Sequence, residues 1–450
     1  MSAWSSVLAK YDVPVPRYTS YPTVPYWAEM PTADQWIQHL RQNLGPQKSW
    51  SMYIHIPFCE TLCTFCGCNT IITRDHKNEN SYVDLVKKEW ALYQQKVPEL
   101  QTSLFRHIHL GGGTPTFLSS ESLRSLLEPI FSNVNRAQKN FEASVEVDPR
   151  RTSKEQLQTL HKIGFNRVSM GIQDFNPEVQ KLVNRLQPFE ITEALTHDAR
   201  AMGYDSVNFD LIYGLAKQTE AGMEESVKQT LQLRPDRIAL YSFALVPWIK
   251  PAQRLFKDED LPKAEEKRKL YEVARGHLLA GGYVEVGMDH FALPTDNLAR
   301  AMKQHELHRN FMGYTDQQTD VMLGLGVSSI SETPDSFHQN EKLLPKYEAA
   351  LATHQIPGLR GHVLSEEDKV RRQQILKLMT EYEVQFESPA QESAAKDFLH
   401  EMMGDGLVEL SQGRMRVTDA GRPFLRNACL FFDERLKRNR PEARIFSQSI

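Results

Sequence analysis

Residues 53–68 read Tyr-Ile-His-Ile-Pro-Phe-Cys-Glu-Thr-Leu-Cys-Thr-Phe-Cys-Gly-Cys, and they continue a short apolar stretch with the composition of a β-strand. Within them Cys59, Cys63 and Cys66 have the spacing CxxxCxxC. Three thiolates on one loop can hold three irons of a [4Fe–4S] cluster and leave the fourth iron free to bind a small molecule. The spacing therefore predicts a cluster that takes part in chemistry.

Two other interpretations of these cysteines remain open at this point. Cys68 would complete a four-thiolate zinc site, although structural zinc sites usually combine two short Cys-x-x-Cys hooks from separate segments. A disulfide fits less well, because the chain has five cysteines and begins MSAWSSVLAKYDVPVPRYTS, without a long apolar core. We therefore expect a reducing, cytoplasmic compartment.

Length and charge exclude several classes of protein. The chain has 450 residues, enough for two or three domains with a large core. Its 53 basic and 57 acidic residues give a net charge of −4, which does not suggest a nucleic-acid partner. No apolar run approaches the roughly twenty residues that a membrane span needs. We expect a soluble protein without a membrane span.

Short β-rich segments alternate with amphipathic segments of helical length between residues 50 and 245. The expected strands are 51–56, 107–110, 143–147, 167–172, 206–212 and 237–243, and the expected helices include 80–93, 120–131, 154–163 and 220–233. Six successive strand–helix units predict an α/β fold in which a parallel sheet curves into a full or partial barrel of the TIM type.

Polar groups and glycines gather where these strands end. The cysteine loop follows the first strand, residues 111–116 follow the second and residues 146–149 close the third. Gln173 closes the fourth strand, and Asp210 lies in the fifth. Because the C-terminal ends of barrel strands meet on one face, we expect these groups to form one site.

The rest of the chain is predicted to add three parts to the barrel. We expect an N-terminal segment at 1–48, the barrel at 49–250 and a lid or barrel extension at 251–360. From 361 to 450 we expect a mostly helical domain that is similar to a winged helix, with helices at 366–381 and 389–404 before a hairpin that turns at 411–414. The expected fold is a partial (β/α)6 barrel between an N-terminal extension and this C-terminal domain.

Further motifs lie along the whole chain. They are RYTSYP at 17–22, YIHIPFC at 53–59, CGCN at 66–69, HLGGGTPT at 109–116, EVDPR at 146–150, MGIQDFN at 170–176, DLIYGL at 210–215, GMDHFA at 287–292 and HRNF at 308–311. Together with CxxxCxxC, these motifs resemble the oxygen-independent coproporphyrinogen III oxidases, a family of radical S-adenosylmethionine (SAM) enzymes. The resemblance extends from Arg17 to the segment 425–429.

The resemblance implies a reaction. Such an enzyme decarboxylates two propionates of coproporphyrinogen III to vinyl groups, giving protoporphyrinogen IX in haem biosynthesis, by means of a 5′-deoxyadenosyl radical made from SAM. It implies an electron donor of the flavodoxin or ferredoxin type and leaves the final electron acceptor unidentified. We expect a monomer.

The resemblance also implies roles for individual residues. Cys59, Cys63 and Cys66 match the ligands of the cluster, and Cys68 matches a neighbour of it. The positions that match contacts of a first SAM, or its surroundings, are Tyr53, Gly112 and Glu146. His55 alternates with apolar residues along the first strand, so it is either a buried barrel histidine or a group close to the cluster or substrate. Tyr53, His55 and Glu146 form the implied catalytic set.

A second SAM is implied by another group of matching positions. These are Phe65, Gly113, Thr114, Gln173, Arg185, Asp210, Ala244 and Ile330. Met312 and Leu245 depart from residues that many relatives carry near this second SAM or the substrate. Arg17, Arg150 and Arg309 each have the chemistry to bind a propionate, because a guanidinium pairs with a carboxylate through two hydrogen bonds.

Two alternative functions remain at this stage. A haem-binding carrier or chaperone can be built on the same barrel, but relatives of that type generally lack the N-terminal motif and the paired Cys-x-Cys. A DNA-binding regulator would use the C-terminal winged helix, whose expected recognition face is not rich in Lys or Arg. The oxidase is the leading hypothesis.

Overall fold

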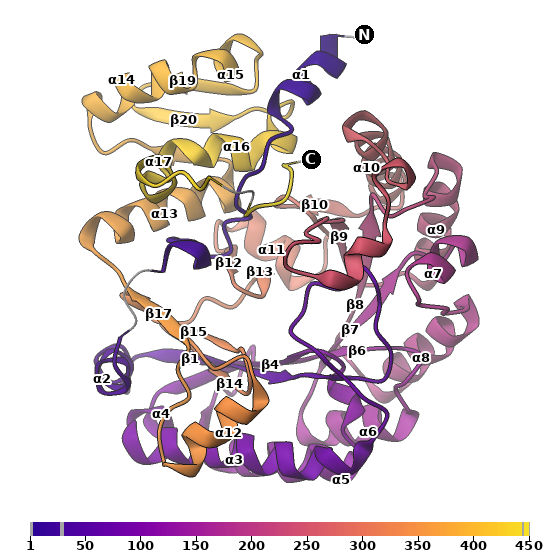
Figure 1. The fold of residues 1–450 in the computed structure, drawn as a ribbon, viewed down its shortest axis with the longest axis vertical. Helices are drawn as coiled ribbons and strands as arrows, with labels where there is room; N and C mark the ends of the chain where they lie inside the picture. The colour runs from indigo at the N-terminus through magenta and orange to yellow at the C-terminus, as the bar shows by residue number, and fades with distance from the viewer. Residues whose placement is uncertain (1–2, 28–30, 443–444, 450) are drawn as a thin grey trace.

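Six parallel strands form the centre of the molecule (Figure 1). The computed structural model describes residues 3–27, 31–442 and 445–449. The strands lie side by side in the order β9, β8, β7, β6, β4 and β1. Their bounds are β1 Ser49–Ile56, β4 Leu104–Gly112, β6 Glu142–Val147, β7 Arg167–Gln173, β8 Ser206–Tyr213 and β9 Arg237–Ser242. All six expected strands are present, and the largest difference at a strand end is three residues.

Helices between these strands cover the outside of the sheet. They are α3 (Glu79–Lys96), α5 (Ser120–Ser132), α6 (Lys154–Ile163), α7 (Pro177–Leu182), α8 (Phe189–Met202) and α9 (Glu220–Leu233), with the short α4 (Glu99–Thr102) and β5 (Asn135–Arg136) before β4 and β6. Their ends follow local sequence rules. For example, the Ser153 hydroxyl caps α6 in a capping box with Gln156, and Gly164 ends the helix at φ 121°.

The strands carry apolar residues on the face toward the helices and polar residues on the face toward the barrel interior. On β4, Ile108 and Leu110 are fully buried in the main hydrophobic core, whereas His107 and His109 are hydrogen-bonded across the sheet to Ser144. The same alternation of polar and apolar residues continues on β6, β7 and β8. The interior of the barrel is therefore polar along its length.

Residues 251–360 extend the sheet at both edges. At one edge β11 (His290–Ala292) pairs antiparallel with β9, followed by β10 (Val284–Val286). At the other edge β14 (Val321–Leu325) runs parallel to β1 and is followed by the antiparallel strands β15 (Ile330–Glu332), β16 (Ser336–Gln339) and β17 (Arg360–Val363). The two end strands do not pair among the described residues, so the barrel is partial. Other elements here are α10 (Ala264–Ala280), α11 (Asn297–Lys303), β12 (His308–Asn310), β13 (Gly313–Thr315) and α12 (Leu344–Ala352).

The C-terminal part is mostly helical and includes the expected hairpin. Its elements are α13 (Glu366–Glu381), β18 (Glu383–Gln385), α14 (Pro389–Phe398), α15 (His400–Gly404), β19 (Val408–Ser411), β20 (Arg414–Val417), α16 (Leu425–Cys429) and α17 (Glu434–Arg438). Helices α14 and α15 occupy the expected helix at 389–404, and β18 adds a third strand beside the hairpin. The domain boundaries at 48, 250 and 360 stay a prediction.

The segment that follows α1 runs past the C-terminal end of the described chain (Figure 1). Helix α1 (Ala3–Tyr11) and residues up to Tyr21 share a hydrophobic cluster with α13 and α16, whereas α2 (Ala33–Asn43) packs on the main core. The Val15 N–H donates to the Ser447 carbonyl at 3.2 Å, and Pro14 bridges Gln448. The C-terminal part is therefore attached to the barrel partly by the N-terminal segment.

Candidate active site

The cysteine loop is held at its base by a short parallel pair of strands. In this pair β2 (Phe58–Cys59) lies beside β3 (Ile71–Ile72). Cys63 is buried, Cys59 and Cys66 are half-buried, and Cys68 is exposed. All five cysteines are free thiols. The four cysteines of this loop therefore range from buried to exposed.

Positively charged groups approach the buried end of this loop. The guanidiniums of Arg150 and Arg185 each lie 3.7 Å from the Cys63 sulfur. Asp148 holds both, at 2.7 Å from Arg150 Nη2 and 3.3 Å from Arg185 Nη1. A hydrogen bond with the neighbouring Cys68 thiol lowers the pKa of Cys66 to about 6. N–H donors beside sulfur stabilise thiolates, so this end of the loop suits an anionic centre.

The loop opens on a cavity of about 510 Å³ at the C-terminal ends of the strands. Tyr241, His290 and Tyr314 lie at its wall, away from the loop in sequence. The predicted site residues that line this cavity are Cys59, Cys63, Phe65, Cys66, Gly112, Gly113, Thr114, Glu146, Gln173, Arg185, Asp210 and Ala244. The fold therefore brings together residues from the loop and five strand ends.

Three predicted site residues do not line the cavity. Ile330 is buried in a separate hydrophobic cluster with Trp27 and Phe337. Tyr53 and His55 lie beneath the cavity, next to residues that do line it. The His55 Nε2 must donate to the Asn69 carbonyl at 2.8 Å, so its Nδ1 accepts from the Tyr53 hydroxyl at 3.0 Å. Burial lowers the pKa of His55, which keeps this ring neutral.

Glycine at positions 112 and 113 is required by the protein itself. Gly112 has φ 112°, and a Cβ there would lie 2.5 Å from the His55 ring. A Cβ at Gly113 would lie 2.6 Å from the Phe58 carbonyl oxygen. Neighbouring residues of this chain therefore account for glycine at both positions, which the resemblance matches to contacts of SAM.

The Glu146 carboxylate lies at the floor of the cavity and is held from below. His109 Nε2 is 3.2 Å from its Oε1, and the Gly112 N–H donates to its Oε2 at 3.2 Å. Burial raises the pKa of Glu146, but these hydrogen bonds outweigh burial and leave the pKa below its usual value. Because a carboxylate only accepts, His109 carries its proton on Nε2, and its Nδ1 accepts from the Ser144 hydroxyl at 2.6 Å.

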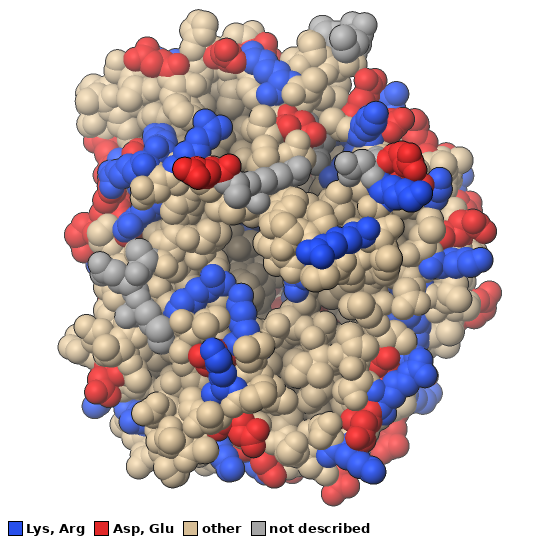
Figure 2. Space-filling model, in the orientation of Figure 1, with Lys and Arg blue, Asp and Glu red and all other residues tan. Residues whose placement is uncertain are grey.

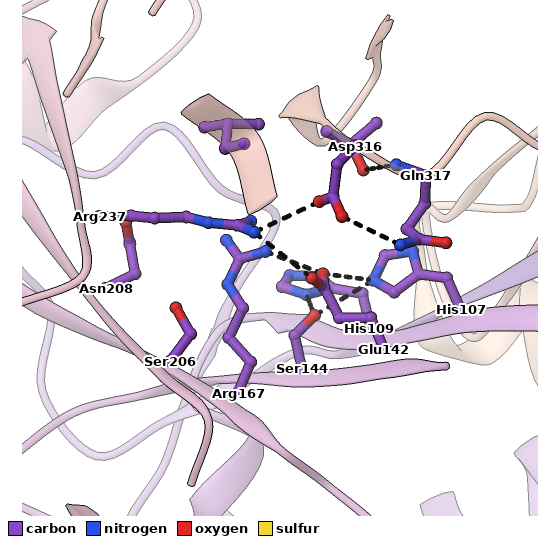
Figure 3. Close-up of polar contacts among 12 residues, drawn as sticks. His107, His109, Glu142, Ser144, Arg167, Ser206, Asn208, Arg237, Asp316 and Gln317 are labelled. Atoms are coloured by element: carbon purple, nitrogen blue, oxygen red, sulfur yellow. Dashed lines mark hydrogen bonds and ion pairs between the residues drawn. The ribbon is translucent and has the colours of Figure 1, made fainter. Parts of the chain in front are cut away.

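A buried ionic network fills the barrel beneath these residues (Figure 3). Arg167 and Arg237 point at Glu142 from β7 and β9, at 2.8 and 3.7 Å. Burial raises the pKa of Glu142, but the two guanidiniums lower it to about 2. His107 Nε2 lies 3.4 Å from Glu142 and 3.2 Å from Ser144. Hydrogen bonds and ion pairs therefore connect Glu146 to the opposite end of the barrel.

Asp210 occupies a different environment on the same floor. It accepts from Ser169 at 3.1 Å and from Asn208 at 2.9 Å. Burial and the nearby charge of Glu146 raise the pKa of Asp210 to about 6. Of the carboxylates that line the cavity, Glu146 is therefore ionised easily, whereas Asp210 is protonated in mildly acidic solution.

Several residues of the site were not predicted from the sequence. His107, His109, Glu142, Ser144 and Arg237 each occupy the polar half of a strand alternation, which is the signal that would have found them. Met312, a departure from the family pattern, lines the cavity, whereas Leu245 packs in a hydrophobic cluster with Val179 and Phe243.

Among the described residues no helix is long and apolar enough to cross a membrane.

Comparisons with known proteins agree with this geometry. The Radical SAM superfamily model matches residues 53–230. The chain is 39% identical over 441 residues to the oxygen-independent coproporphyrinogen III oxidase of Salmonella typhimurium, covering 96% of this chain and 95% of the relative. It is 39% identical over 461 residues to the enzyme of that name from Synechocystis, covering 99% and 98%. A solved structure of coproporphyrinogen III oxidase from Escherichia coli has a TM-score of 0.87 and 37% identity, covering 95% of this chain and 98% of that one.

The fold and the cysteine loop define a radical SAM enzyme. The chain belongs to the family of oxygen-independent coproporphyrinogen III oxidases, which it matches over nearly its whole length. Membership of the radical SAM superfamily implies a [4Fe–4S] cluster and SAM, and so decides against the zinc and disulfide interpretations. The loop fits such a cluster, because three cysteines and two N–H donors beside Cys63 adjoin a cavity.

Proposed function

We propose that this chain decarboxylates two propionates of coproporphyrinogen III oxidatively, without oxygen, and so forms protoporphyrinogen IX in haem biosynthesis. The observation that carries the proposal is the shared cavity of the cysteine loop and Glu146, in a chain 39% identical to the Salmonella oxidase over 96% of its length. When bound, a reduced cluster supplies an electron to SAM, whose cleavage provides the oxidant that removes a hydrogen atom from the substrate. The chain's own residues bind, orient and shield the reactants.

In this proposal Cys59, Cys63 and Cys66 hold the cluster, and Glu146 binds the amino group of the first SAM. An ionised carboxylate suits a cationic amine, and His109 and Gly112 favour the ionised form. Tyr53 stacks on His109 with ring centroids 5.9 Å apart. Tyr53 and His55 therefore act as positioning residues, because they reach the cavity through His109 and Gly112.

A second SAM is assigned to the other side of the same cavity. Support comes from seven of the matching positions, which all line this cavity: Phe65, Gly113, Thr114, Gln173, Arg185, Asp210 and Ala244. Asp210 offers carboxylate oxygens to ribose hydroxyls. Ile330 lies outside the lining, so we propose only an indirect role for it.

Arg17 is the best of the three arginines for binding a propionate. Arg150 already forms an ion pair with Asp148. Arg309 is buried against the Tyr314 ring, 3.9 Å from Asp289. Arg17 donates to the Ser242 carbonyl at 2.8 Å and makes no ion pair among the described residues. It lines both the active-site cavity and a second cavity of about 370 Å³. We propose that the tetrapyrrole extends from one cavity into the other.

The test is an anaerobic assay of the iron-reconstituted protein with SAM, a reductant and coproporphyrinogen III. We expect protoporphyrinogen and about two 5′-deoxyadenosines per product, since two propionates react. Arg17→Ala is expected to raise the KM about tenfold, by loss of a charged hydrogen bond, with a smaller effect in Arg17→Lys. Deoxyadenosine without a porphyrin product would require another substrate. Haem binding without SAM cleavage would instead favour the carrier function.

The cluster assignment has its own test. Cys59→Ala, Cys63→Ala and Cys66→Ala are each expected to abolish the visible absorbance of the cluster and SAM cleavage, whereas Cys68→Ala retains the absorbance. Retention of a four-iron cluster in any of the first three variants would contradict the assignment.

We also infer a cytoplasmic enzyme, because free thiols persist in a reducing compartment. A monomer is proposed, and its mass in solution can be measured by light scattering.

A further inference from the structure

The outer edge of the cysteine loop is contacted by residues from two distant segments. Lys250 Nζ donates to the Cys68 carbonyl at 2.8 Å, and Asn69 donates to the Lys342 carbonyl at 3.1 Å. Gly67 and Cys68 are exposed here. This edge is therefore where the loop that is expected to hold the cluster reaches the molecular surface.

Three cations gather at this edge without acidic partners. Lys250, Lys342 and Arg360 make no ion pair with a carboxylate in the part of the chain that the structure describes. Burial lowers the pKa of Lys342, and the charges of Arg360 and Lys250 lower it further, so the three groups are close enough to repel one another. Figure 2 shows Lys and Arg side chains beside a hollow on the face of the molecule that it draws. Such an arrangement leaves a positive potential for an external anionic group.

Exposed apolar side chains lie next to these cations in sequence. Ile249 is 57% exposed beside Lys250, and Leu343 is 59% exposed beside Lys342. We define the loop rim as these cations and their apolar neighbours in sequence: Trp248, Ile249, Lys250, Lys342, Leu343 and Arg360. Large apolar groups and charges exposed together are typical of a surface that binds another protein.

We propose that the loop rim is the docking surface for an acidic one-electron carrier protein of the flavodoxin or ferredoxin class. The inference rests on the proposed function, because a [4Fe–4S] cluster that reduces SAM must receive its electron from outside the chain. In the docked complex one electron passes from the reduced carrier to the cluster. No bond forms or breaks, and the carrier leaves oxidised by one electron.

The position of the cations favours a protein partner over the substrate. Lys250, Lys342 and Arg360 line neither of the two cavities assigned to SAM and the tetrapyrrole. Lys250 contacts the loop at Cys68, and Lys342 contacts it at Asn69, although neither lysine belongs to the lining of a cavity. Charge complementarity at such a rim accelerates encounter with an acidic partner and makes the rate depend on salt.

The experiment measures reduction of the reconstituted cluster without any porphyrin substrate. The double variant Lys342→Glu with Arg360→Glu is mixed with a reduced, strongly acidic flavodoxin, and the loss of cluster absorbance is followed by stopped flow. We expect the rate at low ionic strength to fall at least about tenfold and to lose most of its salt dependence. Reduction by dithionite, a small anion that needs no docking surface, is expected to slow much less than reduction by flavodoxin. The matched control is Lys88→Glu with Lys96→Glu, two exposed lysines on α3, which should behave like the unchanged protein.

Two results would overturn the proposal. One is an unchanged flavodoxin rate in the double variant. The other is an equal loss with flavodoxin and dithionite, which would assign the cations to the integrity of the loop.

A second measurement uses the unchanged protein. Carbodiimide cross-linking to the flavodoxin, followed by peptide mapping, is expected to join carrier carboxylates to Lys250 and Lys342. Cross-links confined to other lysines would refute the docking surface. Because neither measurement involves coproporphyrinogen, failure of the proposed decarboxylation would be seen separately.

Discussion

At the scale of single residues, the hydrogen-bonding order around His109 determines how Glu146 can act. The neutral His109 ring has a single N–H. Its Nε2–H donates to Glu146 at 3.2 Å, because Nδ1 accepts from the Ser144 hydroxyl at 2.6 Å. The Ser144 hydroxyl oxygen is in turn hydrogen-bonded to His107 Nε2 at 3.2 Å. Each partner therefore fixes the role of the next, and Glu146 is presented to the cavity as an acceptor.

This order predicts the effect of removing His109. In His109→Ala, Glu146 keeps only the Gly112 N–H, so its pKa rises and its orientation is less defined. We expect SAM affinity to fall about tenfold, a loss of about 1.4 kcal/mol, with a smaller loss in His109→Gln. Equilibrium binding of SAM to the cluster-loaded variants measures it. Unchanged affinity in His109→Ala would remove Glu146 from the first SAM site.

Asp210 predicts a dependence of SAM binding on pH. Burial first, and then the Glu146 charge, raise its pKa to about 6, so the carboxylate is present above this pH and is lost below it. If ribose hydroxyls donate to the carboxylate, the second SAM should bind above pH 7 and weaken below about pH 6. Calorimetric stoichiometry between pH 5 and 8 measures this change. Asp210→Asn should bind with little dependence on pH, and a dependence equal to that of the unchanged protein would contradict the prediction.

Sequence reasoning identified the cavity residues better than the residues that support them. Sequence motifs identify residues such as Glu146 and Asp210, because the residue type alone indicates what each side chain can bind. His109 and Ser144 gain their roles only through pairing of β4 with β6, which sets them opposite each other. The sequence also did not predict where Ile330 lies. Its strand β15 is defined by antiparallel pairing with β16 at the edge of the sheet, and hydrophobic periodicity does not reveal such pairing.

At the scale of elements, Glu89 on α3 joins the helix layer to the added edge of the sheet. Its carboxyl group accepts from the Gly326 N–H at 2.8 Å, from Asn340 at 2.6 Å and from the Tyr347 hydroxyl at 2.5 Å. These partners follow β14, follow β16 and lie in α12. Burial raises the pKa of Glu89 to about 7, even though its hydrogen bonds oppose the rise. One fully buried carboxyl group therefore holds three elements of the extension.

The raised pKa predicts how Glu89 affects stability. In the folded state Glu89 ionises near pH 7, and in the unfolded chain near 4.5. The contribution of the protonated group is complete below about pH 4.5 and is lost as the pH rises through about 7. Relative to the unchanged protein, Glu89→Gln should gain about 2 to 3 kcal/mol in free energy of unfolding between pH 5 and 8. Denaturant unfolding at several pH values measures the difference, and a flat difference would contradict it.

The central elements were predictable, whereas the edge elements were not. The six barrel strands alternate with long amphipathic helices, and that pattern is strong. Strands such as β11 and β15 have three residues each and are defined by pairing with a neighbour. Strand β14 is a short apolar run, which periodicity alone does not separate from a helix.

At the scale of the whole molecule, Arg426 connects the two ends of the chain. Its guanidinium donates to the Val15 carbonyl at 3.2 Å, to Gln448 at 2.7 Å and to Ser449 at 2.6 Å. It is almost fully buried, and burial together with the charge of Arg17 lowers its pKa to about 9. Arg426 has no ion pair among the described residues. Its charge is therefore stabilised by the three backbone carbonyl groups that accept its hydrogen bonds.

Loss of this connection should loosen both ends together. In Arg426→Met three carbonyl groups lose a charged donor, and we expect a loss of about 2 kcal/mol in local stability. Hydrogen exchange at the Val15 N–H, which pairs with Ser447, should become about thirtyfold faster, while exchange in β6 and β7 stays the same. Lys369→Met, at an exposed ion pair, is the control. Equal acceleration throughout the molecule would show that Arg426 stabilises the whole fold instead.

The meeting of the two ends has a consequence for the order in which the enzyme is made. The cysteine loop and its barrel strands belong to the first half of the chain, whereas the second cavity has walls from residues 17, 422, 426 and 449. During synthesis the N-terminal segment must wait, without its packing partners, until α13 and α16 emerge from the ribosome. The cysteine loop is thus translated long before the second cavity is complete, and cofactor delivery can precede the enclosure of the substrate.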